Sequence, residues 1–173
     1  DRIKKLSLHG ITKDGWNRFK SSGSWEYDIT RLGFKYNLTD FAAAFGLWQI
    51  NKVEDWKIRR LEIVNQYLNG LANLKNLILP DFPNGHAFHL FVIRLKFNDW
   101  SISRNMFIEK MKENGIGLAV HYKPIHLLSY YKKTYNFKKN LFPNANTLFN
   151  SVVSLPLYPG LKDIEINFII KTI

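Results

Sequence analysis

The sequence contains no cysteine among its 173 residues. This absence excludes disulfide bonds, metal sites built on thiolates and cysteine nucleophiles within the chain. Stability must therefore come from packing. The composition can supply it, because 46% of the residues are hydrophobic and 13 are phenylalanine. This content of apolar and aromatic side chains is typical of a folded globular protein and argues against disorder.

Long apolar segments are also absent. No run approaches the roughly 18 to 20 residues that a membrane-spanning helix needs. The first residues, Asp1 to Lys5, do not lead into the apolar region of a signal peptide. We therefore expect no membrane partner and a cytoplasmic location. The length predicts one substantial domain, or a small domain together with a piece of another.

Acidic residues are few. The sequence has 14 Asp and Glu against 25 Lys and Arg, which gives a formal net charge of +11. Such a field concentrates phosphates, so a nucleic acid or another polyanion is one candidate partner. The lysines are scattered, however, with one local cluster at 132–133 and 138–139, and the patterns of RNA-binding, zinc-finger and basic-zipper domains are missing. Nucleic-acid binding is therefore disfavoured, while anionic small substrates remain compatible with the charge.

Several catalytic motifs are missing as well. The sequence has no glycine-rich phosphate loop of the Walker or dinucleotide type, and no G-x-S-x-G turn. Carboxylates occur near the first loop, but the spacing of Asp14, Asp28 and Asp40 does not identify an acid/base pair.

Three helices are predicted in the first half of the chain. The segment from Ile3 to Leu8 is predicted to form the last turns of a helix, and Gly10 is predicted to end that helix. Because the start of that helix is missing, we expect sequence upstream of Asp1. Thr39 or Asp40 can cap a second helix with apolar residues at three- and four-residue spacing. A loop with a short extended piece at 25–29 precedes it, and a long third helix follows over about 53–72.

Helices and strands alternate in the second half. This alternation favours an α/β or α+β arrangement, in which a small sheet packs against helices. The expected elements are a strand over 91–97, a helix over 103–114, a short strand over 116–120, a short helix over 144–150, a short apolar segment over 152–155 and a terminal helix after 161, with Leu161, Ile164 and Phe168 as its apolar residues.

The tripeptide Lys35-Tyr36-Asn37 lies just before the second helix. A lysine and an amide in such a loop can reach phosphate or sugar oxygens, and Tyr36 adds a flat face. The competing interpretation is an ordinary capping loop with an exposed lysine. The chemistry of these three residues, taken alone, favours the capping loop.

The segment from His121 to His126 gathers His121, Tyr122, Lys123 and His126 after a predicted strand, where α/β proteins often place binding groups. Substrate binding is one interpretation. The other is a structural turn in which Tyr122 is packed and the histidines are hydrogen-bonded. Pro124 prevents the histidines from sharing a helical face. No carboxylate or cysteine nearby completes a zinc ligand set, so we expect no metal site.

The order of these motifs resembles the C-terminal part of the DegT/DnrJ/EryC1/StrS family of sugar aminotransferases, which use pyridoxal phosphate (PLP). The resemblance covers nearly the whole chain. Its segments are Leu8-His9-Gly10, Trp25-Glu26-Tyr27, Leu32 to Asp40, the helix with Ala43-Ala44, Gly46-Leu47 and Gln49, Arg60 and Tyr67, the strand after His86, Gly115-Ile116, His121 to His126 and Leu155 to Pro159.

This resemblance implies an α/β (α+β) fold of the aspartate-aminotransferase type. Residues 1–52 would be the end of the large PLP domain with an active-site loop, and residues 53–173 a C-terminal small α/β domain with a long linking helix. Family members form homodimers and transfer an amino group, usually from glutamate, to a keto group on a nucleotide-linked sugar. The implied pathways make polysaccharides or cell-surface glycans.

The resemblance also implies roles for the site residues. Lys35 and Asn37 would contact the cofactor, and Tyr36 the substrate, where many members carry Asn-Tyr-Arg. His121, Tyr122, Lys123 and His126 would line the sugar-nucleotide cleft. The Schiff-base lysine and the acidic partner of the pyridine nitrogen precede the segment that matches residues 6–10. We therefore expect no catalytic residue within this chain and no activity from it alone. The alternative function is a basic binding module for anionic ligands or nucleic acid.

Overall fold

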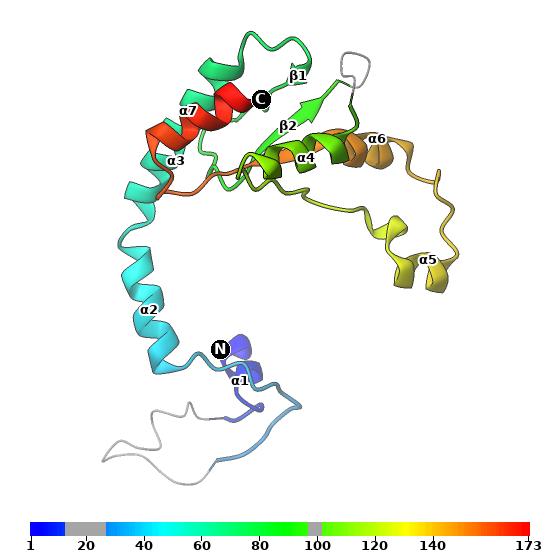
Figure 1. The fold of residues 1–173 in the computed structure, drawn as a ribbon. Helices are drawn as coiled ribbons and strands as arrows, with labels where there is room; N and C mark the ends of the chain where they lie inside the picture. The colour runs from blue at the N-terminus through cyan, green and yellow to red at the C-terminus, as the bar shows by residue number, and fades with distance from the viewer. Residues whose placement is uncertain (13–26, 97–101) are drawn as a thin grey trace. The chain divides into compact units, whose positions relative to one another are not determined.

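The computed structural model describes residues 1–12, 27–96 and 102–173. These residues form two compact units, 1–52 and 53–173 (Figure 1). The extended piece expected at 25–29 lies partly outside the described residues, as do Trp25-Glu26 of the family motif, Asp14 and the end of the strand expected at 97.

The first unit contains helices α1 (Arg2–Ser7) and α2 (Asp40–Ile50). Gly10 follows α1 with a φ of 78°, the left-handed conformation that glycine adopts without strain, which confirms the predicted helix end. Thr39 caps α2, because its hydroxyl accepts a hydrogen bond from the Ala42 amide. No residue of α2 is buried, and Phe41 is 86% exposed.

The second unit is built on a three-stranded antiparallel sheet of β1 (Leu77–Ile78), β2 (Phe91–Leu95) and β3 (Val152–Leu155), in the order β1-β2-β3. The alternation predicted for 91–97 is confirmed, because every second residue of β2 is buried. The segment at 152–155 pairs with β2, with Phe91 opposite Leu155. The fold is thus a mixture of helices and a small antiparallel sheet, as the sequence indicated.

The helices of this unit are α3 (Val53–Leu71), α4 (Arg104–Glu113), the 3-10 turn η3 (Ile125–Leu127), α5 (Ser129–Tyr135), α6 (Pro143–Ser151) and α7 (Asp163–Thr172). Figure 1 shows α5 away from the sheet, where it packs against η3. Helix α3 packs against α7, α4 against β3 and α6 against β2. Ser103 caps α4 as predicted, by accepting a hydrogen bond from the Met106 amide.

The core of the second unit lies between the sheet and its helices. Its fully buried side chains come from α3, β2, β3 and α7: Ile63, Val64, Tyr67, Leu71, Phe91, Ile93, Val153 and Ile166. Burying each aliphatic side chain stabilises the fold by about 1.5–3 kcal/mol. At the rim, the Arg59 guanidinium donates hydrogen bonds of 2.7 Å to the Leu161 carbonyl and to the Asp163 carboxylate, joining α3 to α7. The hydrogen bond from Arg59 to the carboxylate lowers the pKa of Asp163 below its ordinary value.

Two expectations need correction. Residues 116–120 form no strand of their own and make a single bridge, Ala119 to Ser154, because β3 offers them only one pairing position. Helix α7 buries Ile166 and Ile169, whereas the expected Ile164 is 76% exposed. In addition, the segment after the His121–His126 loop, for which no element was predicted, forms α5.

Among the described helices, none combines the length and the apolar character needed to cross a bilayer.

Candidate functional site

The loop that carries Lys35 is held along the end of α1. Residues 33–37, which we call the strap, run antiparallel to residues 6–9, with Lys35 opposite Leu8. The Phe34 amide donates to the Leu6 carbonyl at 2.7 Å, and the Tyr36 amide donates to the Ser7 carbonyl at 2.7 Å. These backbone bonds fix the strap in an extended conformation.

Two glycines permit this close approach. A Cβ atom at Gly33 would collide with the backbone nitrogen of Gly10, and a Cβ atom at Gly10 would collide with the carbonyl oxygen of Arg31. Glycine is therefore required at both positions for the two backbone segments to meet.

The side chains of the strap are exposed. Phe34 and Tyr36 stack with ring centroids 5.0 Å apart, on one side of the extended chain, whereas Lys35 projects from the other. Within the described residues, no hydrogen bond or ion pair occupies the Lys35 ammonium or the Asn37 amide. A free cation and a free amide donor suit the oxygens of a phosphate group.

The second group of predicted site residues begins beside β3. The backbones of Ala119 and Ser154 exchange two hydrogen bonds, of 2.8 and 3.3 Å. Two residues further on, Nδ1 of His121 is hydrogen-bonded to the Ser154 hydroxyl at 2.8 Å. The half-buried imidazole is thereby fixed to the edge of the sheet.

The two side chains that follow His121 are exposed to solvent. Tyr122 is 72% exposed and its ring makes an edge contact with His121. Lys123 is also exposed. The structural turn with a packed Tyr122, one of the two interpretations from sequence, is therefore wrong for the tyrosine, although both histidines are hydrogen-bonded as it required.

His126 differs from the other members of this group, because it is only 4% exposed. Its Nε2 atom lies 2.9 Å from the Oδ1 atom of Asn146. The amide nitrogen of Asn146 donates to the Lys139 carbonyl at 2.7 Å, which fixes the orientation of the amide. His126 Nε2 must therefore carry the proton in this bond, since Oδ1 can only accept. The residue connects the loop to α6.

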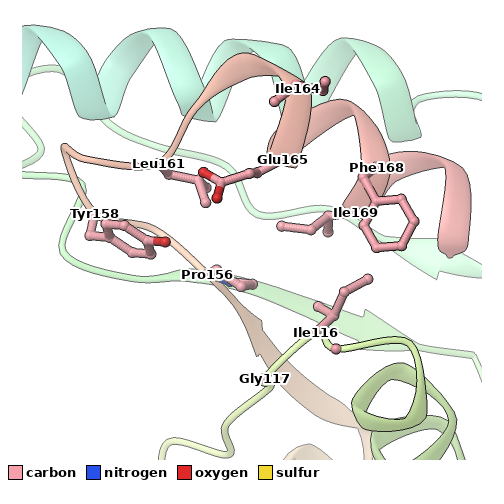
Figure 2. Close-up of a pocket in the computed structure, with 10 residues that line it drawn as sticks. Ile116, Gly117, Pro156, Tyr158, Leu161, Ile164, Glu165, Phe168 and Ile169 are labelled. Carbon is pink, nitrogen blue, oxygen red and sulfur yellow. The ribbon is translucent and has the colours of Figure 1, made fainter.

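A pocket of about 580 Å³ lies elsewhere in the second unit, where α7 faces the turn after α4 and the segment after β3. Figure 2 shows Phe168 and Ile169 projecting from α7 towards Pro156 and Ile116. The lining is mainly apolar, and it includes none of the site residues predicted from sequence.

The predicted residues thus form two groups, one in each unit: Lys35 to Asn37 on the strap, and His121, Tyr122 and Lys123 at the edge of β3. Sequence reasoning missed Ser154 and Asn146, which hold the two histidines. Ser154 could have been noticed as the one polar residue in an apolar strand. Asn146 gives no such signal, because its helix contains three other asparagine or threonine residues.

Comparison with known proteins identifies relatives over the whole chain. The model of the DegT/DnrJ/EryC1/StrS aminotransferase family matches residues 1–173. The chain is 39% identical to the uncharacterized protein MJ1066 of Methanocaldococcus jannaschii and 37% identical to the spore coat polysaccharide biosynthesis protein SpsC of Bacillus subtilis. Each match covers 100% of this chain and 45% of the relative. The chain therefore spans less than half the length of these relatives.

The fold is shared with solved structures. The putative sugar aminotransferase Spr1654 of Streptococcus pneumoniae, in its PMP form, aligns with a TM-score of 0.84 at 34% identity, over 97% of this chain and 42% of that protein. The same protein has also been solved in a PLP form. PseC of Helicobacter pylori, an aminotransferase of pseudoaminic acid biosynthesis, is 21% identical and shares the fold with a TM-score of 0.84, over 98% of this chain and 43% of that protein.

Proposed function

The chain belongs to the DegT/DnrJ/EryC1/StrS aminotransferase family, and on this premise we propose that it forms the C-terminal part of an enzyme that transfers an amino group from glutamate to a keto sugar nucleotide. The family match over all 173 residues carries the proposal. The relationship to SpsC supports a role in polysaccharide or cell-surface glycan biosynthesis, and we place the reaction in the cytoplasm.

The cofactor of this family is PLP, which supplies an electron sink when it is bound. The residues of the strap fit its phosphate group, because Lys35 offers a cation and Asn37 an amide that no other described residue engages through its side chain. We assign these two residues to the phosphate and Tyr36 to the substrate. The backbone bonds of the strap would hold them in place while the ligand binds.

At the edge of β3, we assign Tyr122 and Lys123 to substrate binding. The lysine can pair with a diphosphate oxygen and the phenol can donate to a sugar oxygen. The bond to Ser154 orients His121, so that its other nitrogen can serve as a hydrogen-bonding group. His126 is buried and already bonded to Asn146. We therefore assign it to positioning this loop.

We further propose a homodimer in which residues 1–52 complete the large domain and residues 53–173 form the small domain. Helix α2 supports this assignment. Its apolar residues Phe41, Phe45, Leu47 and Ile50 are each more than half exposed. A helix that is apolar on all sides is normally buried, so α2 requires a covering surface from the rest of the enzyme or from a partner subunit.

We also propose that no lysine of this chain forms the Schiff base and that the chain alone is inactive. Incubation with PLP followed by borohydride and peptide mass spectrometry should label exposed lysines sparsely, without one stoichiometric site. A single fully labelled lysine, or turnover of glutamate with a keto sugar nucleotide, would disprove this part of the proposal.

The reaction itself can be tested in a chimera in which this chain replaces the matching segment of Spr1654. We expect the chimera to hold PLP, detected by its absorbance, and to transfer ¹⁵N from labelled glutamate to a keto sugar nucleotide, detected by mass spectrometry. Lys35→Ala should weaken PLP binding, whereas Lys75→Ala, on the second unit, should not. A chimera that holds PLP but aminates no UDP- or dTDP-linked keto sugar would contradict the proposal.

A further inference from the structure

A row of aromatic rings follows the His121–His126 loop. Its members, which we call the aromatic row, are Tyr130, Tyr131, Tyr135, Phe137 and Phe142. Successive centroids lie 5.4, 6.3, 5.5 and 6.2 Å apart. Tyr131, Tyr135 and Phe137 stack nearly in parallel, with interplanar angles of 14° and 25°.

The row is open to solvent. Tyr130 is 71% exposed, Tyr135 is 60% exposed and Phe142 is 46% exposed. Contiguous apolar faces of this kind are costly in water and commonly mark a binding surface. Tyr135 is stacked with both Tyr131 and Phe137, whereas Tyr130 lies at the end of the row and makes an edge contact with Tyr131. The exposed ring of Tyr130 is therefore the better placed to receive another planar group.

A buried residue supports the C-terminal end of the row. Phe142 packs on the ring of the buried His126, with centroids 5.0 Å apart. Asn146 joins His126 to the carbonyl of Lys139, which lies between Phe137 and Phe142 in the sequence. Asn136 adopts a φ of 51° and ends α5, so that the chain turns directly after Tyr135. The rings are thus supported by the same loop that carries Tyr122 and Lys123.

The segment that carries the row has charged side chains of one sign only. Residues 114–162 contain no aspartate or glutamate, although they include six lysines. Four of these, Lys132, Lys133, Lys138 and Lys139, lie within the segment that carries the row, and all four are exposed. A ligand that suits this segment therefore combines a planar ring with negative charge.

We propose that the aromatic row binds the nucleoside diphosphate portion of the substrate, with the base stacked on Tyr130 and the diphosphate paired with the neighbouring lysines. This inference rests on the proposed function for the identity of the ligand. A neutral glycan would use the rings but not the positive charge. A nucleic acid would use both, but it would need a longer surface of stacking and phosphate contacts.

The test is binding of UDP and GDP to this chain, measured by calorimetry at low salt, with uridine and pyrophosphate as fragments. Tyr130→Leu should raise the Kd of UDP about 5-fold or more, since stacking on one aromatic ring contributes about 1–3 kcal/mol per base. Tyr130→Phe keeps the ring and should bind UDP as the unaltered chain does. Tyr158→Leu removes an exposed tyrosine outside the row and should leave the Kd unchanged.

The lysines have a matched control. The double variant Lys138→Ala/Lys139→Ala should weaken UDP and pyrophosphate but not uridine. The double variant Lys4→Ala/Lys5→Ala, which removes a lysine pair from α1, should weaken none of them. Circular dichroism establishes that each variant is folded.

Three results would overturn the proposal. They are no binding of UDP by the unaltered chain at millimolar concentration, equal Kd values for the unaltered chain and Tyr130→Leu, and binding of an oligo(U) decamer more than 100-fold tighter than UDP at physiological salt. The last would assign the row to nucleic acid. The reaction is tested separately: a chimera that aminates a keto sugar nucleotide with an unchanged KM after Tyr130→Leu disproves only the row. Retained UDP binding without amination disproves only the reaction.

Discussion

The hydroxyl of Tyr67 donates a hydrogen bond of 2.9 Å to the carbonyl oxygen of Pro156. Tyr67 is fully buried on α3, whereas Pro156 directly follows β3. The bond therefore ties the long helix to the segment that leads towards α7, and it satisfies two polar groups next to the core.

Removal of this hydroxyl should destabilise the second unit. Tyr67→Phe keeps the packed ring but leaves the Pro156 carbonyl without its donor, and we expect the free energy of unfolding in urea to fall by about 1–2 kcal/mol. Tyr130→Phe removes an exposed hydroxyl and should change it by less than about 0.5 kcal/mol. Equal losses in the two variants would show that the buried bond contributes nothing specific.

The same tyrosine predicts a pH dependence. Burial, and to a lesser extent the nearby Tyr158, raises the pKa of Tyr67 above its ordinary value of 10.0. The unfolded chain therefore loses this proton first as the pH rises, so the associated stability is fully present below pH 10 and is lost above it. Unfolding free energies measured from pH 8 to 11.5 should fall more steeply for the unaltered chain than for Tyr67→Phe. If the unfolding free energies of the two proteins fell equally with pH, Tyr67 would not be the source of this pH dependence.

Gly33 offers a test of the strap. In Gly33→Ala the new methyl group meets the backbone of Gly10, so the strap must separate from α1. We expect hydrogen exchange at the Tyr36 amide, which donates to Ser7, to become at least 10-fold faster. Gly46→Ala adds the same methyl group to α2, where no atom lies within 4 Å, and it should stabilise the helix by about 0.5–1 kcal/mol. Slow exchange retained in Gly33→Ala would disprove the close packing.

Asn146 links His126 to the carbonyl of Lys139. Asn146→Ala leaves a buried imidazole N–H without an acceptor, and we expect a loss of about 1–3 kcal/mol in the free energy of unfolding. Hydrogen exchange over residues 137–142 should also accelerate. Asn144→Ala, on the same helix but exposed, is the control. If both variants unfold at the same urea concentration, Asn146 is not an anchor.

Much of the local structure could be predicted from sequence because its causes are local. Thr39 and Ser103 cap the helices that follow them, and Gly10 and Gly115 follow helices with positive φ, through contacts within a few residues. The alternation in β2 likewise reflects the opposite orientation of successive side chains. The family could be recognised for a related reason, since its motifs occur in order along the chain.

Other features depend on partners far away in the sequence. Residues 116–120 have the composition of a strand, but pairing requires a neighbour, and β3 provides it only at Ala119. The buried face of α7 is decided by its packing against α3, which places Ile166 inside and Ile164 outside. The two histidines of one short loop look alike in sequence, yet one bonds to Ser154 at the sheet edge and the other is buried against α6.

The amino-acid sequence alone determined the helix ends, the alternating strand and the membership of an aminotransferase family, because each depends on neighbouring residues or on the order of motifs. Only the tertiary structure decided which polar residues are exposed for a ligand and which are used internally. Lys35, Tyr122 and Lys123 are open to solvent, whereas His126 is enclosed. Burial and hydrogen-bond partners are products of packing between distant segments, and they separate the exposed side chains, which we propose for ligand binding, from those that support the loop.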